Sequence, residues 1–197
     1  MKRHGMDPVS GNFRDETLAE WAAPLAQGAV AGSLASLLSS AVLMFSGWRE
    51  TGSAATAANA TSQWIWGDEA LEQQQFDLPH TATGYLIHHG AALFWALGYA
   101  ALTRKLPVTR TPAGIAAGAV ATSAMAYLVD FKMTPSRLTP GFEKRLSQNA
   151  LYAGYGALAV GLAAGAWLMR DRYPEAARQP VRTTANANTT EGTGALS

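Results

Sequence analysis

Four long stretches of this sequence contain no Asp, Glu, Lys or Arg. They cover residues 21–48, 78–103, 111–129 and 146–169 and are 28, 26, 19 and 24 residues long. A helix of a soluble bundle keeps one face in water and carries a charge every few residues, whereas a bilayer core of about 30 Å requires about 20 apolar residues per helix. The charge-free stretches therefore predict an all-α, polytopic membrane protein with four transmembrane helices in one bundle.

The predicted spans set the domain organisation. We expect them at about residues 22–47, 80–103, 111–130 and 146–169, within a transmembrane domain of residues 21–170. Residues 1–20 form a segment before this domain, and residues 49–79 form a long loop between the first two spans. Residues 171–197 contain little apolar surface to bury, which predicts a largely disordered tail.

The ends of the spans carry residues typical of helix and membrane boundaries. Thr111 and Pro112 suit the cap and the first helical residue of the third span. Trp21, Trp48 and Trp167 lie near the ends of the first and fourth spans, where interfacial tryptophans are common.

The distribution of Lys and Arg predicts the orientation. If the N-terminus is cytoplasmic, ten of the 15 Lys and Arg residues lie in cytoplasmic segments and five lie in outer loops. Cytoplasmic segments of membrane proteins carry an excess of these residues. We therefore expect both termini in the cytoplasm and the loop of residues 49–79 outside.

Composition excludes several classes of protein and site. The chain has 197 residues, no cysteine and a net charge of +1, which excludes a disulfide scaffold, a cysteine-ligated metal site and a strongly basic nucleic-acid-binding protein. The sequence also contains no familiar catalytic motif or phosphate-binding loop. We expect no enzymatic activity, no metal, no cofactor and no nucleic-acid partner.

Small residues recur at four-residue intervals within the spans. In a bilayer, helices associate through close packing at such residues, because lipid removes the hydrophobic drive for association. These faces predict a closely packed bundle and leave open a homo-oligomer or a complex with other membrane proteins. The glycines expected to form packing faces are Gly28, Gly32, Gly84, Gly114, Gly118, Gly161 and Gly165.

Two adjacent histidines, His88 and His89, fall within the second predicted span. Ionisable residues inside a membrane are costly and usually face the bundle interior, so this pair is a candidate functional site. Both histidines lie on one helix, which excludes a haem held by two histidines of one protomer. We expect His88, on the small-residue row of Gly84 and Ala92, to face the interior, and His89 to lie closer to lipid.

Two roles remain open for His88. The first is structural: a neutral imidazole hydrogen-bonded to a neighbouring helix, at a residue such as Ser36, Thr122 or Tyr155. The second is a response to protonation, because histidine titrates near mildly acidic pH. The charge-free spans contain no acid to complete a proton relay.

A second set of polar candidates lies near the outer ends of the segments. His80, Asp68 and Asp130 fall close to the outer mouth in the predicted topology. They lack the spacing of a metal-binding motif, so solvated loop side chains are the simpler interpretation.

A further set of features extends over residues 59 to 165: the Trp64–Asp68 segment, His88, Phe94, the Gly98-Tyr99 pair, Pro107, the helix of Gly114 and Gly118, and the Thr134-Pro135 turn. In these features the chain resembles the YagU-like family of uncharacterised bacterial inner-membrane proteins. The resemblance implies four helices in a bacterial inner membrane and carries no established activity.

Two functions follow from these observations as expectations. The first is a structural or interaction component of the cell envelope. The alternative is a small proton-responsive transporter or permeability factor whose pathway passes His88.

Overall fold

The computed structural model of the protein describes residues 12–105 and 111–171, and these residues form helices and loops with no strand. The four longest helices are α1 (Asn12–Thr51), α5 (Thr83–Lys105), α6 (Pro112–Leu128) and α7 (Gln148–Met169). Short helices lie between them: α2 (Thr56–Thr61), α3 (Gln63–Trp66), α4 (Glu69–Glu72), the π-helical turns η1 (Leu78–Ala82) and η3 (Val129–Met133), and the 3-10 turn η4 (Phe142–Lys144). The chain is therefore all-helical in its described part, as the sequence predicts.

Within the part of the chain that the structure describes, three segments are long and apolar enough to cross a membrane. These are Trp21–Thr51, Pro112–Met133 and Gln148–Met169. The second predicted span forms the 23-residue helix α5 but is not among them. The physical reason is its composition, because His88 and His89 lie within α5 and lower its hydropathy.

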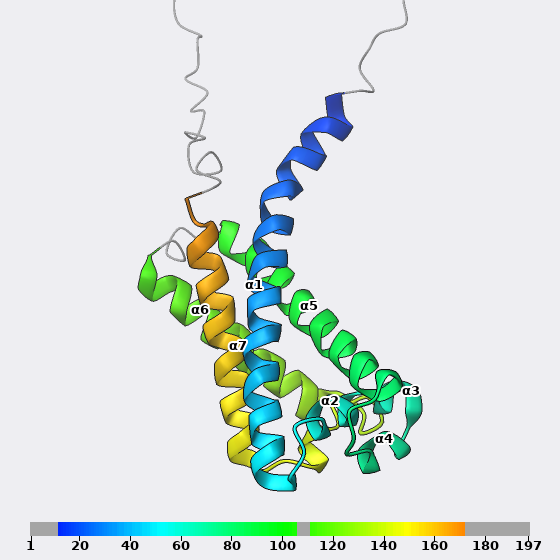
Figure 1. Ribbon diagram of the computed structural model, residues 1–197. Helices are drawn as coiled ribbons and strands as arrows, with labels where there is room; N and C mark the ends of the chain where they lie inside the picture. The colour runs from blue at the N-terminus through cyan, green and yellow to red at the C-terminus, as the bar shows by residue number, and fades with distance from the viewer. Residues whose placement is uncertain (1–11, 106–110, 172–197) are drawn as a thin grey trace, which may run out of the picture.

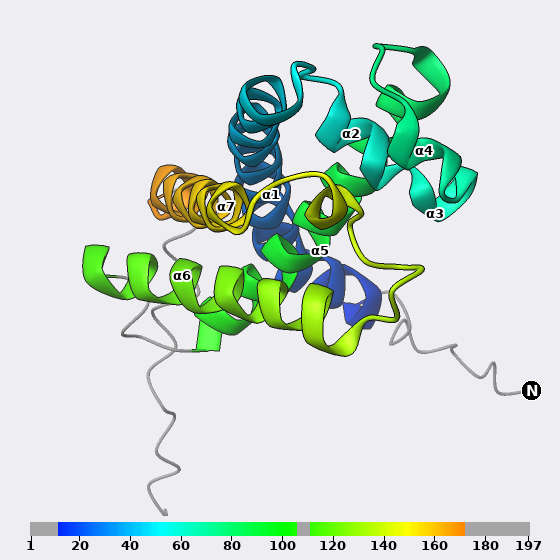
Figure 2. The same ribbon diagram turned by 90° about the horizontal axis from the view of Figure 1, so that it is seen from below.

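Helices α1 and α7 pair along most of their lengths, and the other two long helices lie at an angle to this pair (Figure 1). Helix α5 packs on α1, and α6 packs mainly on α7. Figure 2 shows α6 lying along one side of the assembly, with α7 and α1 above it in that view. The beginning of α1 and the end of α7 lie at the same end of the molecule.

The contacts of α1 with its two main neighbours are made at small residues. A Cβ atom at Gly161 or Gly165 of α7 would collide with the backbone of Ala35 or Ala31. On the other side of α1, a Cβ at Gly28 would meet Leu97, and one at Gly32 would lie 2.9 Å from Leu93 of α5. Backbones approach this closely only where side chains are absent or very small.

The remaining predicted packing glycines have more varied surroundings. Gly118 of α6 lies against the ring of Tyr99, whose hydroxyl donates to the Ile115 carbonyl oxygen. Gly84 lies against the Ala58 carbonyl, so it accommodates the short helix α2 rather than another long helix. The backbone N–H of Gly114 donates to Thr111 Oγ1 at 3.0 Å, which confirms Thr111 as the N-terminal cap of α6.

The loop predicted at residues 49–79 is folded rather than extended. Together with residues 134–147 it forms a compact unit, which we call the cap, beside the lower end of α1 and next to the beginning of α5 (Figure 1). Two fully buried polar side chains join its parts: Asn59 donates to the carbonyls of Gln73 and Gln75, and Gln63 donates to the Thr139 carbonyl. These bonds give the two buried side-chain amides hydrogen-bond partners.

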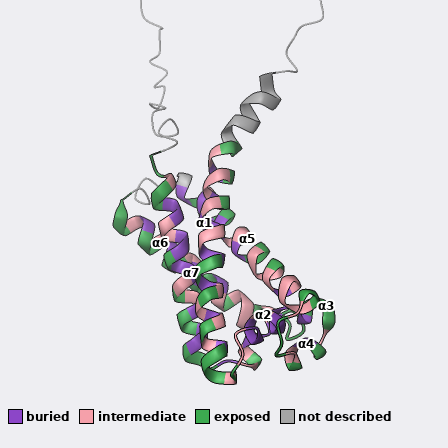
Figure 3. Ribbon diagram, in the orientation of Figure 1, coloured by how far each residue is buried: buried purple, intermediate pink, exposed green. Residues whose placement is uncertain are grey.

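Large apolar side chains point outward along the long helices. Figure 3 shows exposed residues along the outer sides of the helix assembly, and buried residues where the helices meet. Phe94 is 68% exposed on α5, and Val160 and Leu168 are similarly exposed on α7. The outer surface of the long helices is thus apolar, and an apolar surface of this kind is suited to a non-aqueous environment.

We expect Gly161→Ala to lower the melting temperature of the purified protein, because its Cβ would overlap the backbone of Ala35. Overpacking of this kind costs about 1–3 kcal/mol of unfolding free energy. Gly156→Ala on the same helix is the matched control, since a Cβ there meets nothing within 4 Å. Equal melting temperatures for the two variants would contradict the close contact of α1 and α7.

Candidate functional site

A cavity lies among the four long helices, next to the cap. Its volume is about 80 Å³, enough for several water molecules at roughly 10–15 Å³ each. Five polar side chains line it. Four come from the long helices or their continuation, namely Ser39 of α1, His88 of α5, Asp130 of η3 and Tyr155 of α7, and the fifth is Thr61 of the cap. The rest of the wall is apolar and includes Trp64, Trp95, Phe142 and Leu158.

His88 is held by a hydrogen bond to α1. Its Nε2 atom lies 2.8 Å from Ser39 Oγ, and Ser39 Oγ also donates to the Ala35 carbonyl oxygen at 2.7 Å. Either group can donate in this bond, depending on which ring nitrogen of His88 carries the proton. No described residue hydrogen-bonds to the other ring nitrogen, Nδ1.

Asp130 is held by a hydrogen bond to α7. The Tyr155 hydroxyl donates to Asp130 Oδ2 at 2.5 Å. The Tyr155 ring is fixed by edge-to-face contacts with Tyr127 and Phe131, and the carbonyl of Tyr155 accepts from Ser123 Oγ at 2.6 Å. Among the described residues, no Lys or Arg forms an ion pair with Asp130, and its Oδ1 atom has no hydrogen-bond donor.

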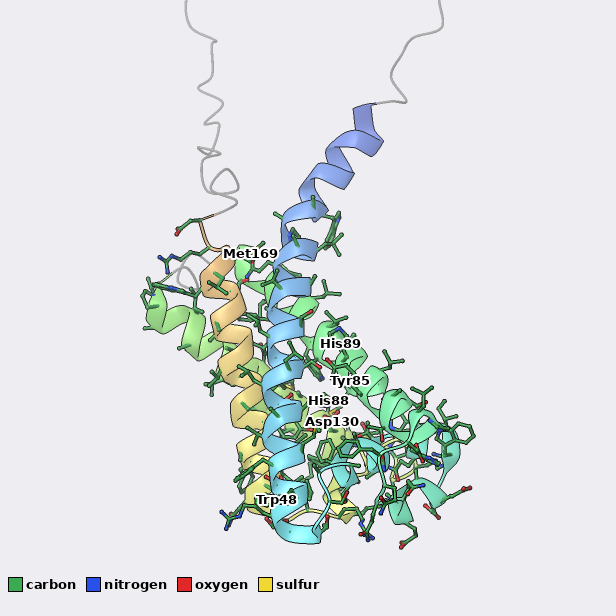
Figure 4. All side chains as sticks on the ribbon, viewed as in Figure 1. Trp48, Tyr85, His88, His89, Asp130 and Met169 are labelled. Atoms are coloured by element: carbon green, nitrogen blue, oxygen red, sulfur yellow. The ribbon has the colours of Figure 1, made fainter. Side chains whose placement is uncertain are left out.

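The structure thus separates Asp130 from the other polar candidates of the outer mouth. Asp130, at the end of the third predicted span, shares a cavity with His88, so an acid lies near this histidine although the charge-free stretches contain none. The reason is local structure, because the helix continues beyond the charge-free stretch as the π-helical turn η3 and carries Asp130 inward to Tyr155. Figure 4 shows His88 and Asp130 at similar heights within the molecule.

Asp68 belongs to the cap, His80 follows the cap in η1, and neither meets Asp130. His80 Nδ1 lies 2.8 Å from Asp77 Oδ2, and the Asp68 side chain is exposed. In the part of the chain that the structure describes, no group of three or more His, Cys, Asp or Glu residues is arranged to hold a metal ion.

The pairing of Asp77 with His80 has an electrostatic consequence in the cap. Desolvation raises the pKa of the Asp77 carboxyl, but hydrogen bonds from the backbone and ring of His80 and the attraction to its charge outweigh this effect. The pKa of Asp77 is therefore lower than its ordinary value. The pairing stabilises the cap at pH values above the usual pKa of an aspartate. This stabilisation is lost as the pH falls through the lowered pKa.

A second cavity of about 190 Å³ adjoins His88. Met44, Thr81 and Tyr85 contribute to its wall, and His88 lines both cavities. His88 therefore lies between a space bounded by Asp130 and Tyr155 and a space bounded by the start of α5.

His89 has a different environment from His88. Its ring stacks on Tyr85, one turn earlier in α5, with ring centres 5.8 Å apart. It contributes to neither of the two cavities, and its Nδ1 atom is buried without a hydrogen-bond partner. The two adjacent histidines thus differ in their contacts, and only His88 joins the polar group at the cavity.

Sequence reasoning missed two members of this site. Ser39 lies on the first helix, one turn from Ser36, and nothing in the sequence distinguishes one serine from the other as the partner of His88. Trp95 lies two turns from His88 on α5, a spacing that places both side chains on one helix face. In the sequence, this spacing is the one indication that Trp95 lies on the same side of α5 as His88.

Comparison with known proteins adds no further constraint on the site. No family model, curated protein or solved structure matches this chain. The resemblance to the YagU-like family stays a prediction.

We expect His88→Leu to lower stability by about 1–2 kcal/mol, the range measured for hydrogen bonds between helices in membranes. Ser39→Ala should cost a similar amount, and the double variant should cost less than the sum, because both changes remove one hydrogen bond. Melting of the four proteins in detergent measures this coupling. Additive losses would show that the two side chains do not interact, and His89→Leu is the control, since His89 lacks this bond.

Proposed function

We propose that the protein is an integral membrane protein that crosses the bilayer four times. Three segments support this by length and composition. Helix α5 is the fourth candidate, because its 23 residues extend about 35 Å at 1.5 Å per residue, which exceeds a bilayer core of about 30 Å. Its outward residues Leu86, Phe94 and Leu102 are exposed and apolar, as contact with lipid requires.

The tryptophans support the same arrangement. Trp21 and Trp48 are both more than half exposed, and the helix between them extends about 40 Å, close to the thickness of a bilayer with its headgroups. Trp167 lies near the end of α7, with the Arg170 guanidinium 3.2 Å from the centre of its ring. Amphipathic aromatic rings and cationic side chains favour this boundary region.

We further propose a bacterial inner membrane as the location, with both termini in the cytoplasm. The excess of Lys and Arg in the predicted cytoplasmic segments supports the orientation. The location is supported by the resemblance to the YagU-like family. In this arrangement the cap faces the periplasm.

Reporter fusions test this topology. Fusion after Asp68, in the cap, should give a periplasmic signal, and fusion after Lys105, at the end of α5, should give a cytoplasmic signal. A periplasmic signal at both sites would show that α5 does not cross the membrane and would reduce the number of spans to three.

For the function itself, we propose a small proton-responsive transporter or permeability factor whose pathway passes His88. The observation that supports it is the cavity in which four helices place Ser39, His88, Asp130 and Tyr155 within an apolar wall. A purely structural hydrogen bond has no need of an adjoining cavity. Two unpaired acceptors, His88 Nδ1 and Asp130 Oδ1, would be costly in a membrane unless water, a proton or a ligand occupied the space.

The groups that can exchange protons at this site come from several elements. His88 lies on α5, Asp130 on η3 and Tyr155 on α7, while α1 contributes Ser39, which does not titrate. Glu143 of the cap is electrostatically coupled to Asp130 and accepts from Thr139 Oγ1 at 2.5 Å. The second cavity, on the other side of His88, extends the pathway toward the start of α5.

Reconstituted vesicles with an entrapped pH indicator test the proposal. A pH gradient is imposed, and the vesicles are challenged with a small organic cation, a small organic anion and a neutral solute. We expect the protein to dissipate the gradient faster than protein-free vesicles in at least one condition, and Asp130→Asn and His88→Leu to abolish the difference. Asp68→Asn is the control, because its carboxylate is exposed on the cap.

A result equal to protein-free vesicles in every condition would overturn the transport proposal. It would favour the second candidate, a structural or interaction component of the envelope. That candidate is supported by the apolar surface of the cap, where Ile65, Phe76 and Leu78 are all more than 60% exposed.

A further inference from the structure

At the cavity, His88 and Asp130 each have one polar atom without a hydrogen-bond partner among the described residues. His88 Nδ1 is such an atom, and it is an acceptor when Nε2 carries the proton and donates it to Ser39. Asp130 uses one carboxylate oxygen to accept from Tyr155, and its other oxygen has no partner among these residues. A ligand that satisfies such a site must supply hydrogen-bond donors.

The residues that line the cavity carry negative charge and no positive charge. Asp130 is the one formally charged residue among those that line it, and the lining contains no Lys or Arg. A carboxylate in an apolar cavity interacts strongly with a positive charge, because water does not screen the attraction there. The charge therefore favours a cation over an anion or a neutral molecule.

Aromatic rings make up much of the remaining wall. Trp64 and Trp95 face this space together with Phe142 and Tyr155. Aromatic faces attract cations through their ring electrons, and ammonium groups are commonly held among several such rings. The combination of aromatic walls and one carboxylate fits an organic cation and not a bare metal ion, which would require more oxygen or nitrogen ligands.

We propose that the cavity binds a small apolar amine in its ammonium form, with the ammonium group between Asp130 and His88 and the apolar part against the aromatic wall. This inference rests on the proposed transport function and names its substrate class. The ammonium N–H groups donate to Asp130 Oδ1 and His88 Nδ1, the two acceptors that the protein leaves unpaired.

Protons and the ammonium ion then compete for the same acceptors. A proton on Asp130 neutralises the carboxylate, and a proton on His88 Nδ1 turns that acceptor into a donor and adds a positive charge. Release of one ammonium ion is balanced by uptake of one proton, so the charge of the site is unchanged. Exchange of an amine cation for a proton follows from this competition, and it accounts for the presence of both titratable groups.

Three probes of similar size test the substrate class. Phenethylamine is a cation at pH 7, 2-phenylethanol is neutral and 3-phenylpropionate is an anion. Binding of each to the full-length protein in lipid nanodiscs is measured by calorimetry and by the change in total tryptophan fluorescence. We expect phenethylammonium to bind at least tenfold more tightly than the alcohol, and the carboxylate not to bind.

Variants connect the binding to the named residues. Asp130→Asn should weaken phenethylammonium at least tenfold while leaving the affinity for the alcohol unchanged, and that unchanged affinity shows that the cavity is intact. Trp95→Leu should weaken the cation more than Trp95→Phe does, because phenylalanine keeps an aromatic face. Asp68→Asn is the control and should bind as the wild type does. The affinity for phenethylammonium should fall as the pH is lowered from 7.5 to 5, whereas the affinity for the alcohol should not.

The results separate this inference from the transport proposal. Binding of the cation without flux in vesicles would support the ligand class and overturn transport. Flux with the anion or the neutral solute alone would support transport and overturn the ligand class. Equal binding of the cation and the alcohol, or unchanged binding of the cation to Asp130→Asn, would also overturn the inference.

Discussion

The close approach of α1 and α7 is the contact on which the rest of the structure depends. Gly161 and Gly165 leave no side chain between α7 and the backbone of α1 at Ala35 and Ala31. This contact fixes α1 against α7 directly beside Ser39, four residues beyond Ala35. The position of Ser39 then determines where His88 can bind, and through His88 the rotation of α5 about its axis.

The cavity exists because the other two long helices are inclined to this central pair. Helix α5 packs mainly on α1, and α6 packs mainly on α7. Helices α5 and α6 therefore contact each other over only part of their lengths (Figure 1). Side chains as large as Trp95 and Tyr155 line the space between them without filling it. Small residues along α1 thus determine which helices are in contact. The polar side chains lie at the cavity, where the helices diverge.

The positions of the long helices in the sequence could be predicted, because the absence of charge over about 20 residues is a constraint on a whole helix and not on one contact. The same counting placed Asp130 at a boundary, since it marks the end of a charge-free stretch. Whether a helix continues past such a residue depends on local hydrogen bonds, here those of η3, and on a partner such as Tyr155 that lies 25 residues away. The pairing of His88 with Ser39 instead of Ser36 depends on helix rotation, which the four-residue repeat of small residues leaves undetermined.

The modest hydropathy of α5 is a consequence of the site that it carries. Polar residues reduce the free energy gained when a helix enters a bilayer, so a helix with two histidines needs compensation from its neighbours. Ser39 supplies it for His88 through one hydrogen bond, and Tyr85 supplies an aromatic contact for His89. Among the described residues, His89 Nδ1 stays buried without a hydrogen-bond partner, whereas His88 and Asp130 line a cavity. Water or a ligand in that cavity can reach the polar atoms of His88 and Asp130, and this is the physical difference between the two adjacent histidines of α5.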